Sequence, residues 1–97
     1  MIKNIEDLIK EVSKAASELG CKEIKGVTRK KEVFSYCKKD CKINFDCSRR
    51  TNAELIVDGT TNEVTKATDK ISDVLSGLSY RIVGYDGMAK YEINLPK

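Results

Sequence analysis

The sequence has 97 residues, which is the length of one domain with a single core, and we expect residues 1–97 to form one unit. Hydrophobic residues make up 40% and charged residues 34% of the chain, a balance that excludes an intrinsically disordered protein. No apolar run approaches the ~18–20 residues that a membrane span needs. The acids Glu6 and Asp7 lie where a signal peptide would be apolar, so a cytoplasmic protein is expected.

The residues that most enzymes use for catalysis are missing from this sequence. It contains no histidine, which excludes a histidine-assisted serine or cysteine nucleophile and an imidazole-ligated catalytic zinc. It also has no glycine-rich phosphate loop and no nucleophile elbow. The sequence therefore predicts a protein that is not an enzyme.

Two segments have the apolar spacing of amphipathic helices. The first follows Asn4, a good N-cap, and ends at Gly20; the second begins near Thr60 or Thr61, where Thr60 and Glu63 have capping-box spacing. The apolar stripes are Ile5, Leu8, Ile9, Val12, Ala15, Ala16 and Leu19 in the first segment and Val64, Ala67, Ile71, Val74, Leu75 and Leu78 in the second. Six positions of the stripes recur at an offset of 59 residues, which we interpret as amphipathic patterning and not as duplication.

The clearest turn signal is Asp86-Gly87, which lies between two runs of alternating apolar and polar residues. Pairing outward from this turn places Arg81 opposite Glu92, a favourable charge pair on one face of a hairpin. The same register predicts an apolar face made of Tyr80, Ile82, Ala89, Tyr91 and Ile93.

Four shorter stretches between the two helices have strand character: Glu23–Thr28, Glu32–Lys38, Cys41–Cys47 and Ala53–Asp58. The sequence thus predicts an α+β fold in the order α-β-β-β-β-α-β-β, with two amphipathic helices packed on one face of a mainly antiparallel sheet. The expected core contains Leu8, Val12, Leu19, Ile43, Phe45, Leu55, Ile71, Leu75, Ile82, Tyr91 and Ile93.

The four cysteines, Cys21, Cys37, Cys41 and Cys47, allow three interpretations. They are separate core thiols, two disulfides (disfavoured in the cytoplasm), or the four ligands of a structural zinc ion. The spacing from Cys37 to Cys41 fits a zinc knuckle, and Cys21 lies just past a helix end. Cys47 is the difficulty, because a continuous strand sets its sulfur ~20 Å from that of Cys41. We prefer zinc, with core thiols as the alternative and an iron–sulfur cluster less favoured.

Positive charge is concentrated in residues 22–50, which carry a net +6, whereas the rest of the chain carries −3. The charges expected at turns are Arg29, Lys30, Lys31, Lys38, Lys39, Arg49 and Arg50, our candidate partner-binding residues. Phe34, Tyr36 and Phe45 lie among them, a combination typical of nucleic-acid surfaces. The simpler interpretation, which we favour, is solvated turns and core aromatics, because a pI of about 8.7 is below that of dedicated binders. The same charges also suit an acidic protein surface.

In its size, its lysine- and asparagine-rich composition, its lack of catalytic residues and its cysteine arrangement, the chain resembles the small phage-encoded anti-CRISPR proteins. The resemblance covers the character of the whole chain and rests on no shared motif, so it assigns no residue roles. It implies a viral protein that binds a CRISPR effector nuclease and blocks the loading of guide or target DNA. We therefore predict protein binding that inhibits a nucleic-acid-handling partner, with direct DNA or RNA binding by residues 22–50 as the alternative.

Overall fold

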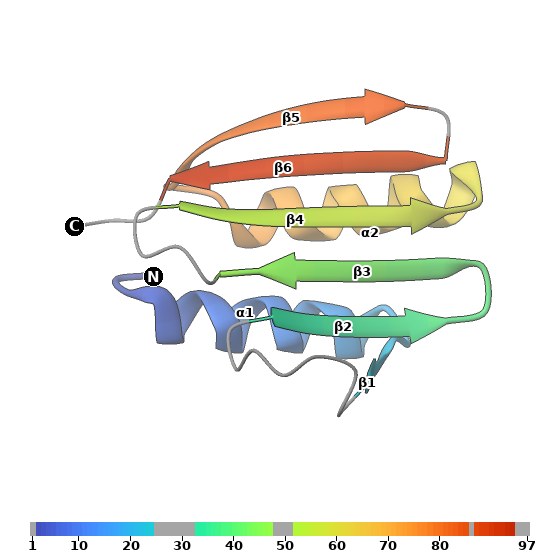
Figure 1. Ribbon diagram of the computed structural model, residues 1–97, viewed down its shortest axis with the longest axis horizontal. Helices are drawn as coiled ribbons and strands as arrows, with labels where there is room; N and C mark the ends of the chain where they lie inside the picture. The colour runs from blue at the N-terminus through green and yellow to red at the C-terminus, as the bar shows by residue number, and fades with distance from the viewer. Residues whose placement is uncertain (1, 25–32, 48–51, 86, 95–97) are drawn as a thin grey trace.

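The computed structural model describes residues 2–24, 33–47, 52–85 and 87–94, and Figure 1 shows their arrangement. The elements are α1 (Ile5–Glu18), β1 (Lys22–Ile24), β2 (Val33–Lys38), β3 (Cys41–Asp46), β4 (Asn52–Gly59), α2 (Thr61–Val74), β5 (Ser79–Tyr85) and β6 (Met88–Asn94). The strands form one antiparallel sheet in the order β1-β2-β3-β4-β6-β5. The predicted α+β class and element order are confirmed.

Both helices begin at the caps that the sequence predicts. The Asn4 side chain accepts a hydrogen bond from the backbone N–H of Asp7 at 2.9 Å, and the Thr60 side chain accepts one from Glu63 at 3.4 Å. These bonds satisfy backbone donors that have no partner within the helix. Gly20 follows α1 with a φ of 87°, the left-handed conformation that commonly ends a helix. Neither described helix has the length and apolar content needed to cross a membrane.

The C-terminal hairpin has the predicted register. Tyr85 is opposite Met88, with two residues between them, and the ladder continues to the last strand positions. The expected charge pair is present, because a guanidinium nitrogen of Arg81 lies 2.7 Å from a carboxylate oxygen of Glu92. The turn, the charge pair and the apolar alternation therefore agree on one register.

Each helix is attached to the sheet by a serine–tyrosine hydrogen bond. Ser13 of α1 lies 2.6 Å from the Tyr36 hydroxyl on β2, and Ser72 of α2 lies 2.8 Å from the Tyr91 hydroxyl on β6. Cross-strand register links Tyr36 to Ala89, two residues from Tyr91 on β6, so the two rings are on the same face of the sheet. Figure 1 shows both helices behind the strands. Ser13 and Ser72 are 59 residues apart, which is the same offset at which the apolar positions of the two helices recur.

The core lies between this face of the sheet and the helices. Nine of the eleven expected core residues are buried: Leu8, Val12, Ile43, Phe45, Leu55, Ile71, Leu75, Tyr91 and Ile93. Leu19 is only half-buried and packs against the core. The prediction for Ile82 is wrong: its side chain is 45% exposed. The reason is its position on the outermost strand, since α2 packs mainly against β4 and β6.

Candidate functional site: the open face of the sheet

The face of the sheet that points away from Tyr36 and Tyr91 is here called the open face. In the part of the chain that the structure describes, neither helix covers it (Figure 1). Strand alternation assigns to it Lys22, Ile24, Val33, Ser35, Cys37, Lys42, Asn44, Asp46, Asn52, Glu54, Ile56, Asp58, Ser79, Arg81, Val83, Met88, Lys90, Glu92 and Asn94. Apolar and charged side chains are therefore mixed on the open face.

A shallow hollow of about 320 Å³ lies on the open face over β1 to β4. Its lining residues are Ile24, Val33, Ser35, Lys42, Asn44, Asp46, Glu54 and Ile56. The apolar part comes from Ile24, which is 37% exposed, and from the half-buried Val33 and Ile56. Ser35 donates a hydrogen bond of 2.8 Å to the side-chain oxygen of Asn44, so neighbouring polar groups in the hollow satisfy one another. An apolar centre inside a polar rim is typical of protein interfaces.

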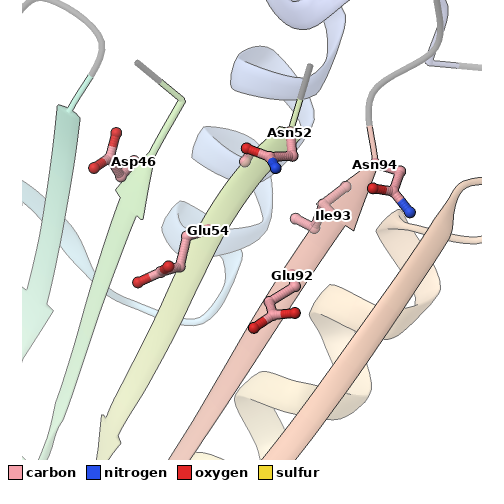
Figure 2. A pocket seen from close by; sticks show the side chains of 7 residues that line it. Asp46, Asn52, Glu54, Glu92, Ile93 and Asn94 are labelled. Carbon is pink, nitrogen blue, oxygen red and sulfur yellow. The ribbon is translucent and has the colours of Figure 1, made fainter. Parts of the chain in front are cut away.

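Next to the hollow, three carboxylates form one row across the sheet (Figure 2). Asp46 of β3 is opposite Glu54 of β4, which is opposite Glu92 of β6. This acidic row lies beside a second hollow of about 290 Å³, lined also by Asn52, Ala53, Ile93 and Asn94. Glu92 is paired with Arg81 at 2.7 Å and Glu54 with Lys90 at 3.5 Å. Within the described ranges, no group of three or more cysteine and acidic side chains is arranged to hold a metal ion.

The predicted partner-binding lysines have different environments. The Lys38 ammonium donates a hydrogen bond to the Leu19 carbonyl oxygen at 2.8 Å and lies 2.7 Å from a Glu63 carboxylate oxygen. The hydrogen bond between the two side chains raises the pKa of Lys38 and lowers that of Glu63. Lys38 therefore joins the end of α1 to the start of α2, whereas Lys39 is exposed at the turn after β2. The other five predicted residues, Arg29, Lys30, Lys31, Arg49 and Arg50, lie outside the described residues.

The aromatic residues near the basic segment belong to the core. Tyr36 and Phe45 are 2% and 0% exposed, and they face the helices. Phe34 is half-buried and packs on Phe45 with ring centroids 6.3 Å apart. Tyr36 and Phe45 are therefore not available to stack on nucleic-acid bases, as the simpler interpretation of the sequence expects.

The structure brings together two of the four predicted zinc ligands. Cys21 and Cys41 are both buried, and their thiols are close enough for each to influence the pKa of the other. Burial raises the pKa of Cys21, and it raises that of Cys41 to about 11, so both remain thiols at neutral pH. Cys37 is exposed and, by register, belongs to the open face, whereas Cys41 faces the core. Cys47 is buried just beyond the opposite end of β3, the arrangement in which strand geometry separates it from Cys41.

The zinc hypothesis stays a prediction. Serine substitutions of the cysteines distinguish it from the alternative that the cysteines are core thiols. Because a hydroxyl costs more to bury than a thiol, we expect Cys47→Ser to lower the free energy of unfolding by about 1–3 kcal/mol. The exposed Cys37→Ser should change it by less than about 0.5 kcal/mol. Urea denaturation of both variants, together with elemental analysis of protein purified without chelator, is the measurement. A greater cost at Cys37, with about one equivalent of bound zinc, would establish the metal site instead.

The open face was missed as a site by the sequence analysis. Its only sequence signal is the polar half of the strand alternation, such as Lys42, Asn44 and Asp46, which is typical of any solvated sheet face. The row and the hollow arise from the pairing of β3, β4 and β6, which local sequence does not specify. No protein-family model and no curated protein matches this sequence.

Proposed function

We propose that the protein is a non-enzymatic binding module whose open face docks onto a protein partner in the cytoplasm. The partner is a nucleic-acid-handling protein, such as a CRISPR effector nuclease, and docking inhibits it. The single observation that carries this proposal is the hollow between Ile24, Val33 and Ile56, an apolar centre bounded by charged side chains. Such a centre excludes water from the contact, while the charged rim selects the partner.

The pairing of charges on the open face favours a protein partner over nucleic acid. The row of Asp46, Glu54 and Glu92, in which Glu54 is paired with Lys90 and Glu92 with Arg81, is a rim of mixed charge. Such a rim suits the charged surface of a nucleic-acid-handling protein better than it suits a phosphate backbone, which is bound by unpaired cations. Docking of the acidic row at such a surface would block guide or target DNA.

The alternative function is direct DNA or RNA binding through residues 22–50. Its support is the net charge of +6 over that segment. Against it, Tyr36 and Phe45 are buried, and Lys38 is held between Leu19 and Glu63. A surface that binds single strands usually combines free cations with exposed aromatic rings.

Ile56→Lys is the substitution that tests the open face. Ile56 lies in the middle of β4, half-buried and at the hollow, so a lysine there places a charge in the apolar centre. We expect it to weaken inhibition of the partner at least ~30-fold, which corresponds to about 2 kcal/mol, the loss of one hot-spot contact. The measurement is target-DNA cleavage by purified CRISPR effector nucleases, titrated with wild-type protein and with the variant.

The matched control is Thr65→Lys, which adds the same charge on the exposed surface of α2. It should inhibit as the wild type does, and both variants should keep the wild-type circular dichroism spectrum. Equal inhibition by the two variants would rule out the open face as the docking surface. If wild-type protein inhibits no nuclease in the panel, the assignment of this partner class is wrong.

Gel-shift titration at two salt concentrations tests the alternative function. A direct binder that neutralises six phosphates should show a log–log salt slope of roughly −5 on duplex DNA, whereas we expect little affinity for free DNA. The diagnostic variant replaces the five basic residues Arg29, Lys30, Lys31, Arg49 and Arg50 with alanine. Tight, salt-sensitive binding by the wild type that this variant abolishes would reverse the order of the two functions.

A further inference from the structure

The outer edge of β5 is a long strand edge that lacks the usual protection against pairing. β5 is the last strand of the sheet, is seven residues long and pairs with β6 on its inner side. Among the described residues, no strand pairs with its outer side. Proteins usually protect such edges with short strands, prolines or free charges. β5 has no proline, and its single charged residue, Arg81, is paired with Glu92.

The side chains of β5 that face the helix side form a self-complementary row. Tyr80 and Ile82 are 36% and 45% exposed, although both are large and apolar. The next residue of the row is Gly84, and a Cβ added there would meet no atom within 4 Å. Along this edge, the exposed ring of Tyr80 is followed by the exposed side chain of Ile82 and then by the open space at Gly84.

The backbone of the same three residues points outward. Two residues separate Tyr85 from Met88, and a turn of this length closes on a hydrogen-bonded pair. Hydrogen-bonded positions alternate along an antiparallel ladder, so Val83 and Arg81 also bond to β6. The N–H and C=O groups of Tyr80, Ile82 and Gly84 are consequently directed to the outer edge.

We propose that two copies of this chain pair their β5 strands antiparallel, centred on Ile82. In this register Ile82 is opposite Ile82 of the second copy, and Tyr80 is opposite Gly84 of the second copy. The outward backbone groups then form about six hydrogen bonds between the copies. Each Tyr80 ring covers the space left by a glycine, and Arg81 is opposite Val83, so no like charges meet.

Other two-fold registers of this edge are less favourable. Centring the pair on Arg81 places two guanidinium groups directly opposite each other, which is destabilising. Centring it on Val83 leaves Tyr80 outside the paired segment, still exposed. The register at Ile82 uses all seven residues of the strand, and this self-complementarity identifies a second copy as the occupant.

The dimer would present a continuous sheet of twelve strands, six from each copy. Opposed residues keep the same face in an antiparallel pair, so the two open faces would lie side by side on one side of the assembly. An interface of one strand edge and two side chains per copy is smaller than that of a permanent dimer. We therefore expect a concentration-dependent dimer with a Kd of about 10–100 µM.

Sedimentation equilibrium between about 5 and 500 µM, chosen to bracket that Kd, tests the pairing. A reducing agent is present so that the exposed Cys37 cannot link two copies covalently. Gly84→Thr fills the open space, and Ile82→Lys adds a charge that protects the edge. We expect each substitution to raise the Kd at least 10-fold while the monomer stays folded. Ile24→Lys, the same change at an exposed isoleucine of the opposite edge strand β1, should leave the Kd unchanged.

Hydrogen exchange of the Ile82 amide provides a readout that needs no variant. In the monomer this amide faces solvent, so its exchange should be fast at low concentration and at least 10-fold slower when the dimer predominates. The proposal is overturned if the wild type stays monomeric up to about 500 µM, well above the expected Kd. It is equally overturned if a dimer persists in both edge variants, or if Ile24→Lys dissociates it.

Discussion

Replacing Tyr91 with alanine is expected to lower the free energy of unfolding by about 3–5 kcal/mol. That loss is a large part of the ~5–15 kcal/mol that stabilises a typical small domain, so the variant should unfold at a much lower urea concentration than the wild type. Tyr91 is fully buried on β6, where its ring fills the space between the sheet and α2. The centroid of its ring also lies 5.7 Å from the ring centroid of Tyr80.

The hydroxyl of Tyr91 accounts for a separable part of this stability. It donates a hydrogen bond to the Thr68 carbonyl oxygen at 3.0 Å and is bonded to the Ser72 hydroxyl at 2.8 Å. Tyr91→Phe should therefore lower the free energy of unfolding by about 1 kcal/mol. Ser72→Ala should lower it much less in the Tyr91→Phe background than in the wild type, because its hydrogen-bond partner is already missing there. Burial raises the pKa of Tyr91, so the bonded group is the neutral phenol at neutral pH.

Urea denaturation followed by circular dichroism measures these differences. Tyr80→Ala is the control for aromatic truncation on the same sheet face, because Tyr80 is 36% exposed. At protein concentrations well below the proposed dimer Kd it should cost about 1 kcal/mol or less. If Tyr91→Ala cost no more than Tyr80→Ala, the position of α2 on β6 would be wrong.

The hairpin and the helix caps were predictable because each depends on residues close together in sequence. Asp86-Gly87 specifies the turn, and the opposition of Arg81 and Glu92 selects the register on either side of it. The caps at Asn4 and Thr60 likewise use side chains within three residues of the N–H groups they satisfy. Local chemistry of this kind does not depend on how the sheet is assembled.

The exposure of Ile82 could not be predicted from the same pattern. Alternation places Ile82 on the correct face but does not say which strand is outermost. That depends on the pairing of β6 with β4, from which it is separated in the chain by α2 and β5, and this pairing leaves β5 at the edge. Pairing between segments so distant in sequence is decided by the whole sheet.

The cysteine spacing shows a related limit of motif analysis. Cys37 and Cys41 have the separation of a zinc knuckle, but the chain between them forms a hairpin turn in which Lys38 is opposite Cys41. Cys37 and Cys41 therefore face opposite sides of the sheet. The meeting of Cys21 with Cys41 depends in turn on how the end of α1 leads into β1. Spacing along the chain cannot distinguish a metal-binding turn from a strand turn of the same length.

Gly59→Ala should be the most damaging turn substitution in the described chain, lowering the free energy of unfolding by about 3 kcal/mol. Gly59 ends β4 opposite Cys41, and its N–H donates to the Gly87 carbonyl oxygen at 2.9 Å. A Cβ at Gly59 would collide with the backbone carbonyl oxygen of Asp40, and the φ of 156° adds strain. Backbone atoms cannot rotate away as a side chain can, so β3 and β4 would have to separate at this end.

The collision would also disturb the start of α2. The Thr60 N–H donates to the same Asp40 oxygen at 3.1 Å, and Thr60 is the N-cap of that helix. Gly84→Ala is the matched control, because a Cβ there meets nothing within 4 Å, and it should leave stability unchanged or raise it by up to about 1 kcal/mol. Urea denaturation of the two variants gives the comparison. If the two variants were equally stable, the turn after β2 would not lie as close to the end of β4 as it does in the structure. The pairing of β3 with β4 would then be wrong at this end.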